Sequence, residues 1–140
     1  MIAYVRHCKA ARLTKLQSIF ELLMAIRKEP LQKRNMVAIA KKFRFANNQV
    51  ADIARISLKA YLKMEPSTYL SVGASERIIK LAELYETGIM ALESKENFIL
   101  WLNLRVPVLC GFRPYELIST YTGIDLIKDA LLRFEYSIPS

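Results

Sequence analysis

The side chains with the clearest chemical potential in this sequence are lysines and arginines gathered between residues 41 and 63. We expect six of these basic residues and two polar neighbours, an asparagine and a serine, to face a ligand. They are Lys41, Lys42, Arg44, Asn48, Arg55, Ser57, Lys59 and Lys63. Residues 1–70 carry fourteen Lys/Arg and four Asp/Glu, whereas residues 71–140 carry seven and nine. A positive field concentrated in one half of a chain is typical of a surface that binds a polyanion. The first half is therefore a candidate for binding the phosphate backbone of DNA.

Groups that would support catalysis or metal binding are sparse. His7 is the only histidine, and the two cysteines, Cys8 and Cys110, lie far apart and form no Cys-x-x-Cys pair. Such a set does not readily supply the ligands of a zinc site or the nucleophile and base of a hydrolase. The sequence has no Walker loop and no G-x-G-x-x-G run, and acids such as Glu83 and Glu86 fit a solvated helix face. We expect no catalytic residues, no metal and no cofactor, and hence no enzyme.

Length and composition limit the fold class. A chain of 140 residues with 53% hydrophobic residues, four glycines and five prolines fits a compact, mostly helical protein and argues against disorder. No apolar run approaches the ~20 residues of a membrane span, so we expect no membrane partner. Cysteines that are few and far apart favour a reduced, cytoplasmic compartment. Because no run with a period of two residues is long enough for a strand, we predict an all-α protein.

Two helices are predicted ahead of most of the basic cluster. Apolar residues recur at helical spacing from residue 13 to residue 26, which predicts the first helix. Pro30 fits the first position of a second helix. The inward side of this second helix is expected to consist of Met36, Val37, Ala40 and Phe43.

A pair of short helices is predicted next. Asn47 and Asn48 can cap a helix over 49–54, and Ser57 can cap another over 58–64. The apolar residues of the latter are Leu58, Tyr61 and Leu62. Two short helices across a turn of about three residues form a helix-turn-helix candidate. The spacing alone also fits an ordinary corner in a helical protein, and the basic surroundings favour DNA.

The second half is predicted to open with a connector over 66–73 and then the longest helix of the chain. The apolar residues of that helix are Ile78, Ala82, Tyr85, Ile89 and Leu92. Gly88 inside it costs about 1 kcal/mol relative to alanine, which indicates close packing at that point. The connector also separates two predicted lobes, a basic lobe with the helix-turn-helix over 1–70 and a second helical lobe over 71–140.

Three further helices are predicted beyond the long one. Ser94 can cap the first, Pro114 can begin a second, and residues 122–125 have the form of a capping box that begins the last. The buried side of the first is expected to include Phe98, Trp101 and Leu102. The last helix places on one face Ile124, Ile127, Leu131 and Phe134.

Several short motifs occur together from residue 75 onward. They are Ser75-Glu76-Arg77-Ile78-Ile79, Trp101-Leu102, Gly111, Pro114-Tyr115-Glu116-Leu117-Ile118, Thr120, Gly123 and Leu131-Leu132-Arg133-Phe134-Glu135-Tyr136. In this order and at this approximate spacing they resemble the C-terminal domain of Xre/MbcA/ParS-type antitoxins. The upstream helix-turn-helix lies where such antitoxins carry theirs, although that half matches weakly. Members of that family pair with RES-domain toxins, which are NAD-degrading enzymes.

The resemblance implies the antitoxin of a type II toxin–antitoxin pair, with its far C-terminus inserted into the substrate cleft of a cognate RES-domain toxin. The residues to which this points are Arg133, Glu135, Tyr136, Ser137 and Ile138. It also implies that the helix-turn-helix binds double-stranded promoter DNA, as a homodimer, in transcription regulation. The alternative is a stand-alone DNA-binding transcriptional regulator without a toxin partner.

The sequence departs from the family at three positions. Arg55 stands where the family often has glycine, and a non-glycine residue there costs on the order of 1 kcal/mol if φ is positive. Lys59 and Lys63 stand in a helix that in relatives often carries arginines, which favours phosphate contacts over guanine-specific ones. Ser137 follows Tyr136 where glycine is common, so the inserted tail is expected to take a different path.

Overall fold

The computed structural model describes the backbone of residues 15–137 and the side chains of residues 19–133. Within this range the chain is all-helical, as predicted, and the one extended pairing is an isolated bridge between Gln32 and Tyr69. The elements are α2 (Lys15–Lys28), α3 (Lys33–Phe43), α4 (Asn47–Ala54), α5 (Leu58–Lys63), α6 (Val72–Leu92), α7 (Lys95–Leu102), the 3₁₀ helix η2 (Pro107–Leu109), α8 (Pro114–Leu117) and α9 (Tyr121–Ser137). None of these helices is both long enough and apolar enough to cross a bilayer.

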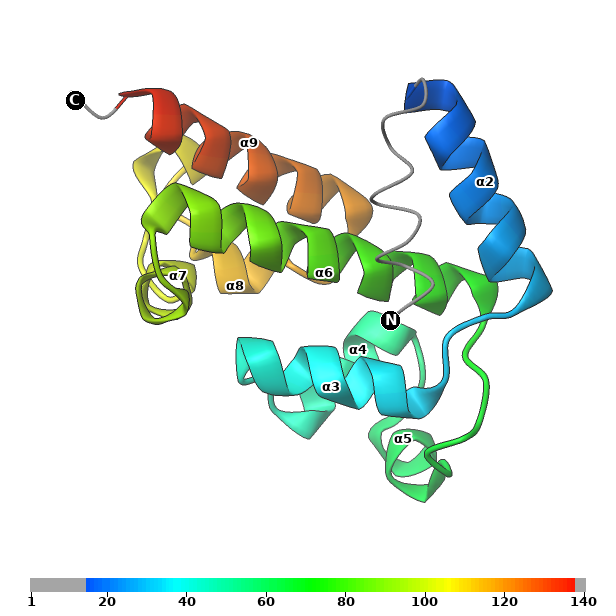
Figure 1. Cartoon of the computed structure of the whole chain (residues 1–140). Helices are drawn as coiled ribbons and strands as arrows, with labels where there is room; N and C mark the ends of the chain where they lie inside the picture. The colour runs from blue at the N-terminus through cyan, green and yellow to red at the C-terminus, as the bar shows by residue number, and fades with distance from the viewer. Residues whose placement is uncertain (1–14, 138–140) are drawn as a thin grey trace.

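Helix α6 is the central element of the fold. Helix α9 lies beside it and runs in the same direction, because Tyr121 at the start of α9 hydrogen bonds with Gly73 and Glu76 near the start of α6. Helices α2, α3, α4 and α7 also pack against α6. Figure 1 shows α3, α4 and α5 beneath α6, with the last turn of α9 at the opposite end of the molecule from α5.

Gly88 allows α7 to pack tightly against α6. A Cβ atom at Gly88 would lie 2.3 Å from Cδ1 of Phe98, a distance that no real contact tolerates. The ring of Phe98 is fully buried and occupies the space that a larger residue at position 88 would need. The close packing predicted from this glycine is therefore confirmed.

Aromatic rings connect α3 to this part of the core. The ring of Phe43 meets the ring of Tyr85 at 5.5 Å and that of Phe98 at 5.8 Å, both edge to face. Edge-to-face pairs at such separations stabilise a core beyond the area they bury. The buried residues form one cluster that draws on helices from α2 to α9. The division into lobes at residue 70 stays a prediction.

Two predicted helix starts are confirmed by their caps. The hydroxyl of Ser57 accepts a hydrogen bond from the Ala60 amide at 3.1 Å, and that of Ser94 accepts one from the Asn97 amide at 3.1 Å. Helix α8 begins at Pro114, as expected from the fixed φ of proline. These signals are local in sequence, which is why they could be read directly.

The predicted start of the second helix at Pro30 is wrong, because α3 begins at Lys33. The preceding residues are held in an extended path by partners distant in sequence. The amide of Leu31 donates to the hydroxyl of Ser75 at 3.0 Å, and the carbonyl of Leu31 accepts from the Leu70 amide at 2.7 Å. Asn35 then accepts from the amide of Gln32 at 2.9 Å, which places the helix start after residue 32.

Two other predicted caps lie at neighbouring residues instead. Helix α4 already includes Asn47 and Asn48, and its extended cap residue is Ala46. Helix α9 begins at Tyr121 rather than with a capping box over residues 122–125, since Thr120 Oγ1 accepts from the Gly123 amide at 3.0 Å. In both cases the element was predicted, and its boundary was misplaced by about two residues.

Candidate nucleic-acid interface

Helices α4 and α5 form the helix-turn-helix candidate. They pack against each other across a turn of three residues, Arg55, Ile56 and Ser57. Arg55 has φ of 61°, in the left-handed region where glycine is preferred. A non-glycine residue with positive φ costs on the order of 1 kcal/mol of conformational energy, so Arg55 carries that cost at this turn.

Helix α5 is held in place by a lysine on α3 that the sequence analysis did not assign to the site. Lys33 Nζ donates to the carbonyl of Met64 at 2.8 Å and lies 4.7 Å from the centre of the Tyr61 ring. Burial raises the pKa of Tyr61, so its ring stays neutral beneath the ammonium group. Lys33 thus fixes the end of α5, and no local sequence signal separates it from the other lysines of α3.

The structure brings three of the predicted DNA-binding residues together on the outer surface of α5. Ser57, Lys59 and Lys63 are all exposed, and the two lysines lie one helical turn apart. Tyr61 is the one buried side chain of this helix. The surface opposite Tyr61 is therefore basic and open to a ligand.

The remaining predicted residues lie elsewhere and face in different directions. The guanidinium of Arg55 turns toward the second half of the chain and donates to the Ser119 carbonyl at 3.3 Å. Lys42 points at α6, with its ammonium 5.4 Å from the centre of the Tyr85 ring. Lys42 is exposed at the end of α3, as are Lys41 and Arg44, and Asn48 is exposed at the start of α4. Lys59 and Lys63 therefore share one face of a single helix, whereas the other predicted residues are spread over α3, α4 and the turn after α4.

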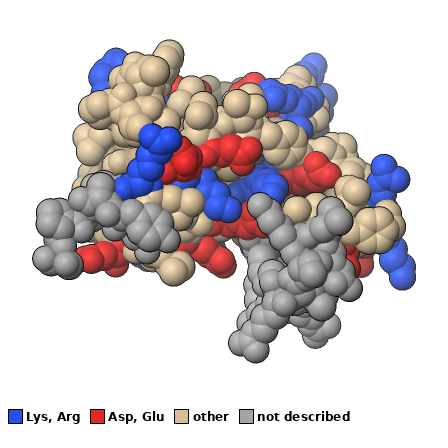
Figure 2. All heavy atoms as spheres, turned by 90° about the horizontal axis from the view of Figure 1, so that it is seen from above, with Lys and Arg blue, Asp and Glu red and all other residues tan. Residues whose placement is uncertain are grey.

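The charged residues in and around helices α4 and α5 are mostly positive. Residues 33–65 carry eight lysines and arginines but only two acids, Asp52 and Glu65. By contrast, Figure 2 shows acidic and basic side chains next to one another on the face seen from above. A positive potential confined to one part of a surface attracts a polyanion to that part.

Side chains distant in sequence fix the helix-turn-helix to the second half of the chain. Arg77 Nε on α6 donates to the carbonyl of Ile53 in α4 at 2.6 Å, and Gln49 Nε2 donates to the carbonyl of Tyr115 at 3.3 Å. These contacts were not predicted, because neither partner has a local signal. They give α4 a defined orientation on α6 and α8.

The predicted toxin-binding residues lie at the end of α9, and the structure describes only part of them. Arg133 is exposed and forms an ion pair with Asp129 at 3.0 Å. The backbone of Glu135, Tyr136 and Ser137 continues the helix, whereas Ile138 lies outside the described residues.

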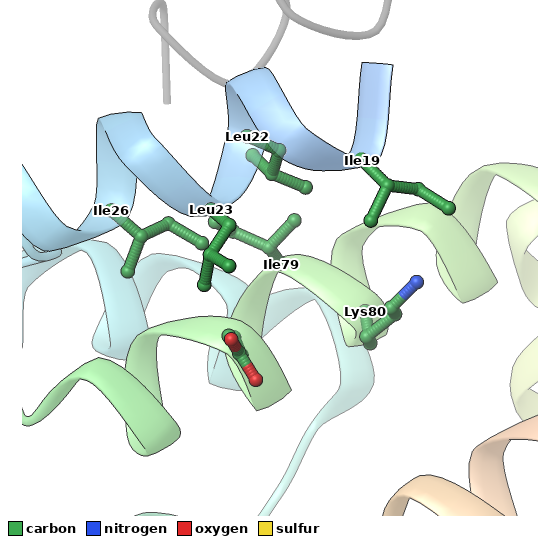
Figure 3. Close-up of a pocket in the computed structure, with 7 residues that line it drawn as sticks. Ile19, Leu22, Leu23, Ile26, Ile79 and Lys80 are labelled. Carbon is green, nitrogen blue, oxygen red and sulfur yellow. The ribbon is translucent and has the colours of Figure 1, made fainter. Parts of the chain in front are cut away.

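A hollow of about 200 Å³ lies between side chains of α2 and α6. Figure 3 shows Ile19, Leu22, Leu23 and Ile26 of α2 on one side and Ile79 of α6 on the other. The wall is apolar except for Glu76 and Lys80 of α6. Its chemistry therefore gives no reason to assign a catalytic or metal site to it. Among the described side chains, those of residues 19–133, no three His, Cys, Asp or Glu gather as metal ligands would.

No family model matches the chain, and no curated protein matches it.

Proposed function

We propose that this chain is a non-enzymatic antitoxin that binds DNA through α4 and α5 and neutralises a RES-type NAD-degrading toxin with its C-terminus. The single observation that best supports DNA binding is the outer surface of α5, where Lys59 and Lys63 project from a helix-turn-helix. Helices held in this arrangement insert the second helix into the major groove of DNA. The homodimer that we expect would place two such helices one turn of DNA apart, at about 34–36 Å.

The DNA half of the proposal is tested by titrating a fluorescent promoter duplex with protein at several salt concentrations. Each phosphate contact releases counterions, so the logarithm of the association constant should fall linearly with the logarithm of salt. Replacing Lys59 and Lys63 by glutamine should weaken binding and reduce that slope by about one for each lost contact. Lys95→Gln is the matched control, because Lys95 is an exposed lysine on α7, in the half of the chain outside the helix-turn-helix. A folded protein that binds no duplex would refute this half.

The toxin half is supported by the resemblance of residues 75–136 to the antitoxin family and by the placement of α9. The last turn of α9 and helix α5 lie at opposite ends of the molecule (Figure 1). A toxin on one end and DNA on the other could therefore be bound at the same time. We propose a cytoplasmic complex in which the tail occludes the toxin's substrate cleft.

Co-expression with the protein encoded by the adjacent gene, followed by purification and an assay of NAD consumption, tests this half. Deleting residues 136–140 should release NAD consumption while leaving the helical circular-dichroism spectrum in place. The double glutamine variant of Lys59 and Lys63 is the control, since it should still inhibit. Inhibition that survives the deletion would refute occlusion by the tail.

The alternative, a stand-alone transcriptional regulator, shares the DNA surface and lacks the toxin. It is favoured by the distance of α5 from the last turn of α9 (Figure 1), because the proposed DNA surface is complete without any contribution from that turn. The two are separated by whether a small NAD-cleaving protein is encoded next to this chain and co-purifies with it. Salt-dependent DNA binding with no such partner would leave the regulator as the function.

A further inference from the structure

Helix α5 exposes two kinds of side chain in parallel stripes. Successive residues of an α-helix are rotated by about 100°. With Tyr61 directed inward, Lys59 and Lys63 fall on the opposite side, and Leu58 and Leu62 fall together on one flank. The leucines are 43% and 57% exposed, although leucine is normally among the buried residues. A pair of exposed leucines one turn apart, beside a pair of lysines, is the unexplained feature of this helix.

The two stripes suit different parts of a DNA duplex. A lysine ammonium on a long flexible stem reaches the phosphates and contributes affinity without reading the base sequence. A leucine cannot bind a phosphate, and the apolar group that the major groove offers is the C5-methyl of thymine. The leucine stripe can therefore distinguish thymine, through its methyl group, from the other bases.

The other residues of α5 offer few competing ways to read bases. Lysine can contact guanine but lacks the planar fork of arginine, and the exposed Ala60 carries a single methyl group. Adenine is read in the major groove by asparagine or glutamine, and cytosine by aspartate or glutamate. The helix consists of Leu58-Lys59-Ala60-Tyr61-Leu62-Lys63 and contains none of these four residue types. The Oγ of Ser57 accepts from the Ala60 amide at 3.1 Å, which holds this side chain against the start of the helix, and the side chain of Arg55 donates to the Ser119 carbonyl.

From these observations we infer that Leu58 and Leu62 read thymine C5-methyl groups in the major groove, while Lys59 and Lys63 hold the adjacent phosphates. The inference rests on the proposed function, because it requires that α5 enters DNA. It adds the chemical class of the recognised sites: duplexes whose bound face presents clustered thymine methyls. Lys33 and the Ser57 cap are the positioning residues that keep this face of α5 outward.

The test compares thymine with deoxyuridine, which pairs identically and lacks only the methyl group. A preferred duplex is first selected from a random pool with the full chain, and each thymine is then replaced singly by deoxyuridine. Binding is measured by fluorescence anisotropy at fixed salt. Loss of one buried methyl should weaken binding about fourfold at each contacted position. Deoxyuridine at uncontacted positions should have no effect.

Leu58→Ala and Leu62→Ala then identify the readers. Because both leucines are exposed, their replacement should leave the fold intact, as circular dichroism will show. Each variant should bind thymine and deoxyuridine duplexes equally at the position that its leucine contacts. Leu100→Ala is the matched control, since Leu100 is a 66% exposed leucine on α7, and it should keep the full sensitivity to deoxyuridine.

The remaining outcomes overturn the inference in distinguishable ways. Duplex binding that is indifferent to deoxyuridine, or a selection that returns no preferred sequence, refutes methyl readout and leaves the proposed function standing. An equal loss of affinity for both duplexes in the leucine variants, together with a change of oligomeric state in sedimentation, shows that the leucines bind a second copy instead. A folded chain that binds no duplex refutes the inference and the DNA half of the proposed function together.

Discussion

Helix α6 is packed differently on the sides that face α7 and α2. Toward α7, the missing Cβ of Gly88 lets the ring of Phe98 lie directly against the helix backbone. Toward α2, a hollow of about 200 Å³ remains between apolar side chains. Packed interiors transmit strain and resist change, whereas a hollow forfeits the contacts of the atoms that line it.

This difference indicates which parts of the molecule move as one body. On the tightly packed side of α6, which faces α7, Phe43 joins α3 to α6 and α7. Arg77 joins α4 to α6. The helix-turn-helix is therefore fixed to the tightly packed side, and we expect α2 to separate from α6 at a lower free energy than α7 does. The geometry of α4 and α5 should therefore depend on the side of α6 that packs against α3, α4 and α7, and little on α2.

The largest expected effect comes from matched leucine truncations on the two sides. Leu102 of α7 is fully buried, whereas Leu23 of α2 is half-buried and lines the hollow. Leu102→Ala should lower the free energy of unfolding by about 2–5 kcal/mol, because the surrounding core cannot collapse around the lost atoms. Leu23→Ala should cost about 1 kcal/mol or less. Urea unfolding followed by circular dichroism measures both, and equal costs would remove the distinction between the two sides.

The contact between Gly88 and Phe98 is tested directly by adding a methyl group. Gly88→Ala should gain about 1 kcal/mol of helix propensity. The added Cβ would collide with the Phe98 ring, so the net result should be a loss of about 1–3 kcal/mol. In a Phe98→Leu background the same substitution should cost less, and the difference in unfolding free energy gives the coupling between the two sites. No coupling would mean that the ring is not what excludes a side chain at position 88.

Reading the sequence succeeded where a signal local in the chain was enough. A glycine inside an apolar helical pattern signals close packing by itself, and Ser57 and Ser94 signal helix starts by themselves. The existence of every described α-helix and the turn of three residues between α4 and α5 followed from such local patterns, whereas the 3₁₀ helix η2 was not predicted.

What the sequence did not show depends on partners distant in the chain. Pro30 lies outside α3 because Ser75 and Leu70 hold the chain extended there. The turning of Arg55 away from the surface of α5 depends on the Ser119 carbonyl, 64 residues later. The exposure of Leu58 and Leu62 follows from which side of α5 packs on α4, and an apolar residue type does not reveal this for so short a helix.

Filling the hollow between α2 and α6 should raise the free energy of unfolding. Leu23→Phe adds an aromatic ring where the hollow has room, so the free energy of unfolding should rise by about 0.5–2 kcal/mol. Leu102→Phe is the matched control, because the same change in a filled core overpacks it and should cost about 1–3 kcal/mol. Thermal unfolding of the two variants gives shifts of opposite sign if the comparison holds. A destabilising Leu23→Phe would show that the space between α2 and α6 is needed as it is.

The smallest effect concerns a third side of α6, where α9 is attached by a polar contact. The Tyr121 hydroxyl lies 2.8 Å from a carboxylate oxygen of Glu76, and burial together with this acid raises the pKa of Tyr121 from 10.0 to about 12. Below pH 10 the phenol is neutral in both the folded and unfolded states, so its contribution is fully present. As the pH rises from 10 to 12, the unfolded chain loses this proton first, and stability falls.

Tyr121→Phe should therefore make the alkaline loss of stability less steep over this range. It should not abolish that loss, because burial also raises the pKa values of Tyr61 and Tyr115. Glu76→Gln removes the charge that opposes ionisation and should lower the pKa of Tyr121, visible in the ultraviolet absorbance of tyrosinate. If Glu76→Gln left this titration unchanged, burial alone would hold the proton, and the contact between α6 and α9 would be apolar in character like the rest of the core.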